Sequence, residues 1–164
     1  MGQWPDSLLH AVFADGQVEW WVENNLHKLD GPAVQYPNGD REWWIKGELY
    51  YSVKADGTKA WFLEGRWHRL DGPAIKWPNG GREWMVHRTR HRVDGPAAEF
   101  PGGHQEWWVD GKRHRADGPA VIKGNGRQQW WVNGRLHRLD GPAVIKGDDR
   151  RQWWIDGVRQ ADHH

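Results

Sequence analysis

The feature that most constrains this chain is a 23-residue motif that recurs along almost its whole length. Each copy begins near an aromatic pair whose first member is always tryptophan, and we call these residues the first ladder: Trp20, Trp43, Trp61, Trp84, Trp107, Trp130 and Trp153. Asp-Gly-Pro-Ala recurs in phase with them, at Asp30, Asp71, Asp94, Asp117 and Asp140. A fixed period of about 20 to 50 residues is typical of repeat architectures. Residues 1–164 are therefore expected to form one repeat domain, with residues 1–9 as an N-terminal cap or arm.

Within one repeat, the residue types predict two antiparallel strands. The segment 129–132 contains the aromatic and β-branched residues that strands prefer, and Asn133-Gly134 after it is typical of a tight hairpin turn. A second strand is expected over 136–145, with a bulge or bend at Asp140-Gly141-Pro142, because proline cannot donate to a ladder. The sequence therefore predicts an all-β fold, an elongated and twisted antiparallel β-meander of about seven two-stranded repeats and about fourteen strands.

The turn between repeats predicts which side chains share a face of the sheet. With its centre between residues 125 and 126, Val121 would lie opposite Trp130, and Ala120 opposite Trp131. Because side chains alternate between faces, the two members of each aromatic pair are expected on opposite faces. The second members, which we call the second ladder, are Trp21, Trp44, Phe62, Met85, Trp108, Trp131 and Trp154. We expect the first ladder in a close-packed interior and the second ladder outside, where so large an apolar stripe needs a cover or a partner.

The His-Arg-x-Asp cluster before each Gly-Pro-Ala has two interpretations. In the structural one, the histidine lies opposite the first-ladder tryptophan, and the arginine pairs with the aspartate of its own or of the next repeat, while the aspartate also anchors the Gly-Pro bend. In the functional one, a row of arginines beside the tryptophans forms a stacking groove for nucleotides or single-stranded nucleic acid. The arginines that would form its polar rim are Arg69, Arg92, Arg115 and Arg138.

Repetition argues against chemistry at these clusters. A catalytic site is needed once, whereas this cluster recurs from repeat to repeat, so we predict no catalytic residue and no enzyme activity. Equivalent histidines of adjacent repeats are expected about 9–10 Å apart, which is too far for them to share one zinc ion. The sequence therefore predicts neither a metal site nor a cofactor.

Two irregularities interrupt the pattern. Only 18 residues separate Trp43 from Trp61, and the segment 48–52 replaces the His-Arg-Leu-Asp-Gly segment of the other repeats. We expect the sheet to pinch there and to form a notch with Tyr50, Tyr51 and Lys54 at its rim. The second irregularity is the segment 86–89, which lacks the turn glycine. Because local rules tend to break at functional or strained sites, the notch is a candidate specificity site.

Composition narrows the classes of partner and compartment. The chain has 23 Lys and Arg against 22 Asp and Glu, whereas a duplex-DNA binder normally shows a basic excess. There is no cysteine, which excludes a disulfide framework. We find neither a signal peptide nor an apolar run long enough to span a membrane, so we expect a cytoplasmic protein.

The pattern W-W-x-x-G-x-x-H-R-x-D-G-P-A, followed by a P-N-G-like turn, resembles the MORN repeat over roughly residues 10–160. His-Arg-x-Asp-Gly-Pro-Ala stands where that family has His-Gly-x-Gly, so the chain looks like a divergent variant, similar to Trp-rich repeats of bacterial and large-phage proteins. The resemblance implies an elongated, twisted β-sheet with a scaffold or interaction role, often with dimerisation, and no enzymatic activity. Lipid binding is claimed for such repeats, but the near-neutral charge gives it little support.

These features together favour a non-catalytic binding or scaffold protein. Its partner would be a protein, recognised through the second ladder or by β-augmentation at an open strand edge. A small bacterial or phage-encoded inhibitor, of the anti-defence or immunity type, fits the resemblance. The alternative is a protein that sequesters nucleotides or single-stranded nucleic acid through its tryptophans and arginines. A homodimer through the sheet edges is compatible with both.

Overall fold

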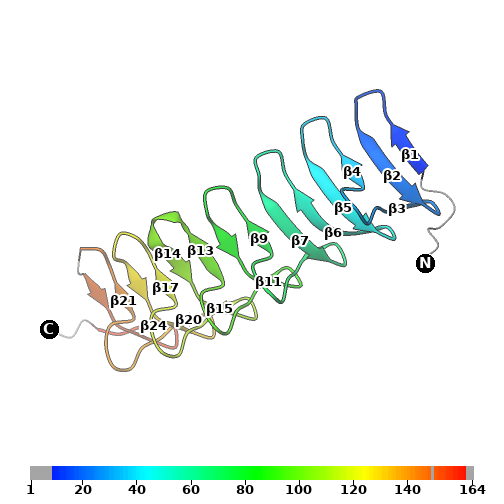
Figure 1. Ribbon diagram of the computed structural model, residues 1–164. Coiled ribbons are helices and arrows are strands. Elements are labelled where there is room, and N and C mark those ends of the chain that lie inside the picture. The colour runs from blue at the N-terminus through cyan, green and yellow to red at the C-terminus, as the bar shows by residue number, and fades with distance from the viewer. Residues whose placement is uncertain (1–8, 149, 162–164) are drawn as a thin grey trace.

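The computed structural model describes residues 9–148 and 150–161, and it is an elongated, twisted β-structure (Figure 1). Its repeats follow one another along the long axis, with the first strand at one end and the last strand at the other. The described residues contain no α-helix, and one short 3-10 turn, η1 (Pro101–Gly103), lies between two strands. The predicted all-β repeat architecture is therefore confirmed.

One antiparallel sheet runs through the molecule, and neighbouring strands in its main path follow in chain order. The fourteen strands of this path are β1 (Leu9–Val12), β2 (Val18–Val22), β4 (Val34–Gln35), β5 (Arg41–Ile45), β6 (Glu48–Val53), β7 (Lys59–Leu63), β9 (Ile75–Lys76), β10 (Arg82–Glu83), β13 (Ala98–Phe100), β14 (His104–Glu106), β17 (Val121–Ile122), β18 (Gln128–Gln129), β21 (Val144–Ile145) and β22 (Arg151–Gln152). Two further strands, β3 (Asn25–Leu26) and β8 (Arg66–Trp67), pair with β2 and β7 beside this path. The predicted meander and its number of strands agree with this path.

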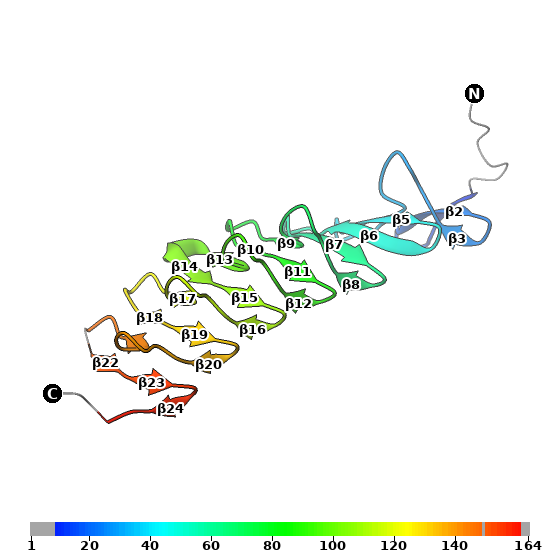
Figure 2. The same cartoon turned by 90° about the horizontal axis from the view of Figure 1, so that it is seen from below.

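A second row of short hairpins accompanies the C-terminal repeats (Figure 2). Each hairpin starts directly after a first-ladder tryptophan: β11 (Met85–Val86) with β12 (Thr89–Arg90), β15 (Trp108–Val109) with β16 (Lys112–Arg113), β19 (Trp131–Val132) with β20 (Arg135–Leu136), and β23 (Trp154–Ile155) with β24 (Val158–Arg159). Backbone hydrogen bonds join neighbouring hairpins, such as Arg115 N to Trp131 O at 3.2 Å and Gly134 N to Arg113 O at 2.9 Å. The expected single strand over 136–145 is wrong: the Asp-Gly-Pro segment separates β20 from β21, and the two pair with different strands.

The predicted register across the turn between repeats is wrong by one residue. Val121 lies opposite Gln129 rather than Trp130, because the loop has three residues and is centred on Asn125. Lys123 N donates to Arg127 O at 2.9 Å, and Gly126 takes the left-handed conformation that closes the loop. The shift moves every side chain of the strand to the other face. The first ladder therefore shares its face with the Ala residues of Gly-Pro-Ala, as shown by the bond from Trp130 N to Ala143 O at 2.8 Å.

The hairpin turns follow the predicted chemistry. Asn133 and Gly134 have φ values of 49° and 80°, as a type I′ turn requires. The two copies that lack the turn glycine adopt the same turn, with Glu23 and Asn24 at φ 48° and 60° and with His87 and Arg88 at φ 46° and 67°. A non-glycine residue in this conformation is strained, so the neighbouring repeats impose the turn on His87 and Arg88.

The core is thin and recurs at each of the five Gly-Pro-Ala segments. Most of its apolar side chains are the Ala of this segment and the residue after it: Ala33, Val34, Ala74, Ile75, Ala97, Ala98, Ala120, Val121, Ala143 and Val144. These two positions point to opposite faces of one strand, so both faces of the sheet are covered there. The loop before each alanine lies over the face that carries the first ladder. The tryptophans of this ladder are only half-buried and are not among the core residues, so the expected close-packed interior around them is wrong.

Candidate functional site

Each His-Arg-x-Asp-Gly-Pro loop folds back over a first-ladder tryptophan. The Arg92 guanidinium lies 4.0 Å from the centre of the Trp84 ring, and Arg92 Nε donates to Asp94 Oδ1 at 2.8 Å. Arg92 Nη1 also donates to the backbone oxygen of Pro96 at 3.2 Å. The same stacking and the same aspartate partner occur at Arg69, Arg115 and Arg138. The arginine therefore pairs with the aspartate of its own repeat and not with that of the next repeat, which was the other pairing considered from the sequence.

The glycine of each loop makes room for this arginine. A Cβ atom added to Gly95 would lie 2.9 Å from Arg92 Cζ, and one added to Gly118 would lie 3.1 Å from Arg115 Cζ. The guanidinium is thus packed between a tryptophan ring and the glycine backbone. These arginines stabilise the loop, and their stacking surfaces are occupied within their own repeat.

The histidines tie neighbouring repeats together. His91 lies opposite Trp84, since its backbone N donates to Trp84 O at 3.1 Å, as the structural interpretation predicted. His114 Nδ1 accepts the backbone N–H of Asn133 in the next repeat at 3.3 Å, and His27, His68, His91 and His137 make the equivalent bond. The histidine ladder therefore links each loop to the hairpin of the following repeat.

Successive loops enclose a series of equivalent grooves on the first-ladder face. Three consecutive grooves have volumes of about 660, 660 and 670 Å³. The middle groove has Trp107 and Val109 among its lining residues, with Pro96 on the wall formed by one loop and His114 on the wall formed by the next. Adjacent grooves share a wall, because Val93 lines both of the first two. The loops follow one another like the teeth of a comb, and we call each His-Arg-x-Asp-Gly-Pro loop a tooth. Figure 2 shows the stacked repeats of the C-terminal half, to which these loops belong.

The outer edge of each tooth is both apolar and acidic. We call the large exposed aliphatic residues that lie between Arg or Lys and Asp the rim residues: Leu29, Leu70, Val93 and Leu139, with the smaller Ala116 at the same position of one loop. Val93 is 81% exposed, and the Asp94 side chain beside it is 78% exposed, whereas the Arg92 side chain is only 22% exposed. Hydrogen bonding from the arginine lowers the pKa of Asp71, Asp94, Asp117 and Asp140. The teeth therefore present aliphatic groups and ionised carboxylates to solvent at neutral pH.

The second ladder lies on the other face and is half-buried along most of its length. Met85 is only 6% exposed, and the indole N–H of Trp108 donates to Glu106 Oε2 at 2.8 Å. Trp21 and Trp44 make the same bond to the glutamate two residues earlier. At these three positions the indole N–H groups therefore have partners within the chain. Contact of the second ladder with a partner protein stays a prediction.

Glu106 is the centre of a charged cluster under the second ladder. It accepts hydrogen bonds from His104 Nε2 at 2.9 Å and from Arg113 Nη2 at 3.3 Å, and Arg90 Nη1 lies 3.7 Å away. Burial raises the pKa of Glu106, but Arg113 and the hydrogen bonds from Trp108 and His104 outweigh it, so the pKa is lowered. In the next repeat Gln129 replaces this glutamate, and Trp131 Nε1 has no hydrogen-bond partner among the described residues.

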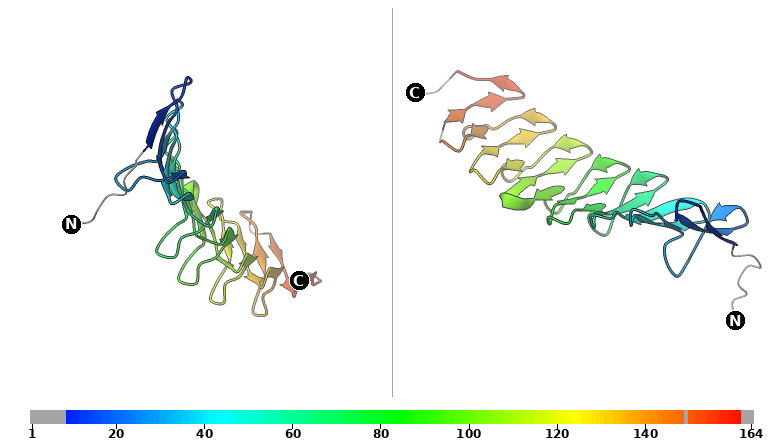
Figure 3. Two further views of the ribbon diagram at one scale, coloured as in Figure 1. Left: turned by 90° about the vertical axis from the view of Figure 1, so that its right-hand side faces the viewer. Right: turned by 90° about the horizontal axis from the view of Figure 1, so that it is seen from above.

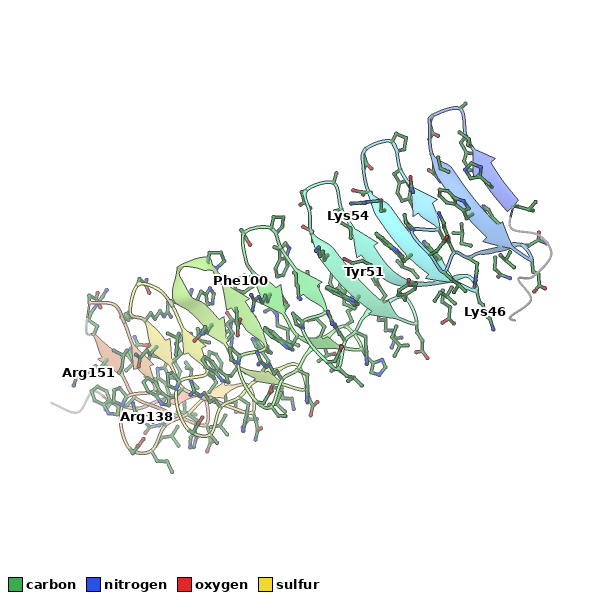
Figure 4. The ribbon with its side chains drawn as sticks, in the orientation of Figure 1. Lys46, Tyr51, Lys54, Phe100, Arg138 and Arg151 are labelled. Carbon is green, nitrogen blue, oxygen red and sulfur yellow. The ribbon has the colours of Figure 1, made fainter. Side chains whose placement is uncertain are left out.

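The sheet does not pinch at the predicted notch. β6 pairs with β5 and with β7, and a bulge between Trp43 and Trp44 absorbs the irregular length. Tyr51 packs between Trp43 and Trp61, with ring centres 4.9 Å from each, and burial raises its pKa (Figure 4). Lys54 pairs with Asp40 at 2.9 Å near the end of β6, and Tyr50 is exposed. A role of these three residues in specificity stays a prediction.

The described residues contain no group of three or more His, Cys, Asp and Glu side chains placed to hold a metal ion. None of the helices in the described part of the chain has the length and apolarity needed to cross a membrane. No protein-family model matches the sequence, and no curated protein matches it. The resemblance to MORN repeats therefore stays a prediction.

Sequence reasoning missed the grooves and their apolar rims. The signal was the residue directly before Asp-Gly-Pro, which is Leu, Val or Ala in all five copies although it lies in a polar turn segment. Periodicity could not show that this position points to solvent, because the loop around it follows neither strand nor helix geometry.

Proposed function

We propose that the protein is a non-catalytic binding module that recognises a protein partner through the groove face, defined as the three grooves and their rim residues. The observation that supports this proposal most strongly is the repetition of one groove with the same lining at three successive repeats. Isolated exposed aliphatic residues are common on surfaces, but a row of them along successive grooves is typical of an interaction site. An inhibitor of bacterial or phage origin that acts in the cytoplasm fits this proposal.

The groove face supports a protein partner better than a nucleic acid. A strand of phosphates would meet the exposed carboxylates of Asp94, Asp117 and Asp140, while the neighbouring arginines are occupied by tryptophan, aspartate and proline. Phosphate contacts by Lys and Arg supply most of the affinity of nonspecific nucleic-acid binding, and this face offers few of them.

The proposal is tested by capture from a bacterial lysate with wild type and a groove-face variant, Val93→Lys/Leu139→Lys. Both positions are highly exposed, so the variant is expected to fold, which the circular dichroism melting curve checks. A matched control, Val12→Lys/Val158→Lys, makes the same changes on the first and last strands, where the side chains are 66% and 64% exposed. Mass spectrometry of the captured material reads out both protein and nucleotide.

We expect wild type and the control to retain the same protein and the groove-face variant to lose it. Equal capture by all three proteins would reject the groove face as the binding surface. Loss in the control alone would point to β-augmentation at the sheet edges. Capture of nucleotide or nucleic acid, lost in the groove-face variant, would favour the sequestering function instead.

A further inference from the structure

The spacing of the grooves restricts the shape of any ligand that occupies more than one of them. Neighbouring grooves are related by one repeat, which advances the main sheet by two strands, or about 9.6 Å at a strand spacing of about 4.8 Å. A ligand lying across the teeth must therefore present equivalent groups at about this interval. The groove face thus favours ligands whose equivalent groups recur at this distance, in addition to those with suitable chemistry.

Among regular peptide conformations, the polyproline II helix has this period. It has about three residues per turn and a rise of about 3.1 Å, so every third side chain recurs on the same side after about 9.3 Å. A β-strand brings equivalent side chains back after about 6.6 Å, and an α-helix turn advances only about 5.4 Å. A polyproline II segment across the teeth would therefore place one residue of each triplet at every groove.

The lining of the grooves suits such a segment. Trp84, Trp107 and Trp130 lie on successive groove floors beside Val86, Val109 and Val132, and the walls carry Pro73, Pro96 and Pro119. Aromatic-lined grooves are the usual receptors of polyproline II ligands, because the preformed helix loses little entropy on binding. Proline rings of the ligand would occupy the grooves between the rim residues.

The charges of the teeth select the remaining residue of the triplet. Asp94, Asp117 and Asp140 expose 78%, 82% and 82% of their side chains, and each engages its arginine through Oδ1. These carboxylates recur with the grooves, whereas the paired arginine side chains are only 22–24% exposed. A ligand complementary to this row carries a positive charge once per turn.

We infer that the groove face binds a polyproline II segment with a lysine or arginine at every third position. The inference rests on the proposed function and names the chemical class of its partner. The ligand lies across the teeth, with its cations on the tooth aspartates and its proline rings in the grooves.

Isothermal titration of the full chain with synthetic peptides tests the inference. The probe is a peptide of four Pro-Pro-Lys triplets, compared with peptides of one and two triplets. Because each triplet up to the third occupies one more groove, we expect the affinity to rise about 100-fold between one and four triplets. A peptide of the same composition with lysines spaced by two and four residues in turn is expected to bind at least about tenfold more weakly, and four Pro-Pro-Glu triplets are expected not to bind.

Matched variants locate the contact. Asp94→Asn/Asp117→Asn removes two tooth carboxylates and is expected to weaken the peptide about tenfold, an effect that added salt diminishes. Glu48→Gln/Glu64→Gln removes two exposed charges outside the lining of the three grooves and is expected to leave the affinity unchanged.

The outcomes separate the inference from the proposed function. Equal affinity for the regular and irregular peptides, equal affinity for the Glu peptide, or tighter binding of an oligothymidine than of the Lys peptide would overturn the inference. If no peptide binds but the groove-face variant still loses a captured protein, the inference fails and the proposed function stands. If neither peptide nor protein depends on the groove face, both fail.

Discussion

The N-terminal and C-terminal halves of the molecule use the same repeat differently. In the N-terminal half, β2, β5 and β7 run unbroken through both members of the aromatic pair. In the C-terminal half, the main strand ends before the first-ladder tryptophan and a separate hairpin begins after it. Figure 3 shows the consequence, a flat sheet at one end and two rows of strands at an angle at the other.

The neighbouring strand accounts for this difference at β2 and β5. β2 pairs with β1 as far as Trp21, and β5 pairs with β6 as far as Ile45, so each has a partner extending through the aromatic pair. In the C-terminal half, loops occupy the flanking positions on both sides of Trp84, Trp107 and Trp130. The absence of an extended neighbour lets the chain bend at the tryptophan, and the loops then enclose the grooves.

Removal of a first-ladder tryptophan in the C-terminal half is expected to have the largest effect. Trp107→Ala deletes the ring on which Arg115 stacks and part of a groove floor, so the free energy of unfolding should fall by about 3 kcal/mol. Urea denaturation followed by circular dichroism measures it. A loss below about 1 kcal/mol would contradict the packing described for the first ladder.

Tyr51 is the corresponding test of the N-terminal half. It fills the place between Trp43 and Trp61, so Tyr51→Ala should cost about 2 kcal/mol. Tyr51→Phe keeps the ring and should lie within about 0.5 kcal/mol of wild type in the same denaturation experiment. If both variants lose the same stability, the hydroxyl rather than the ring packing is what matters at this position.

The loop glycine sharpens the comparison, because it acts only where an arginine stacks. Gly118→Ala pushes against Arg115 Cζ and should cost about 1–2 kcal/mol in urea denaturation. In the Arg115→Ala background the same change should cost almost nothing, since the clashing group is gone. Equal costs in both backgrounds would show that the glycine is required by the backbone alone.

The hairpin at His87 and Arg88 offers a smaller, stabilising change. Arg88→Gly relieves a left-handed conformation at φ 67° and should raise the free energy of unfolding by about 1 kcal/mol. Arg135→Gly, in a strand of another hairpin, is the control and should destabilise by about 0.5–1 kcal/mol. A loss of stability in Arg88→Gly would mean that its side chain contributes more than the strain costs.

Acid is expected to have the smallest effect. The pKa values of Asp94, Asp117 and Asp140 are lowered by their arginines, relative to about 3.9 in the unfolded chain. Their stabilising contribution is complete above the unfolded pKa and is lost as the pH falls through the lower folded pKa. The urea concentration at the unfolding midpoint should therefore decrease as the pH is lowered below about 4, and it should decrease less steeply in the triple Asp→Asn variant. An identical decrease in that variant would show that these Arg–Asp pairs do not contribute to the acid sensitivity.

The sequence predicted the features that depend on short-range chemistry. The repeat, the meander and the Gly-containing turns follow from strand and turn residues. An Arg–Asp pair follows from the recurring cluster, whereas the choice of Asp94 of the same repeat as the partner of Arg92 comes from the structure. The register was missed because Asn125-Gly126 fits both a two-residue turn and the three-residue loop that forms, and the two differ by one residue. The pairing of β6 with both of its neighbours and the groove face were missed because they depend on the structure of adjacent repeats.

The affinity of the captured protein for two variants tests the central claim most directly. Val93→Lys/Leu139→Lys alters the groove face, whereas Trp108→Phe/Trp131→Phe alters the second ladder on the opposite face and preserves its aromatic packing. We predict at least about a tenfold loss of affinity in the first variant and less than about a twofold change in the second. Loss confined to the second variant would contradict the account and would make the second ladder the binding surface.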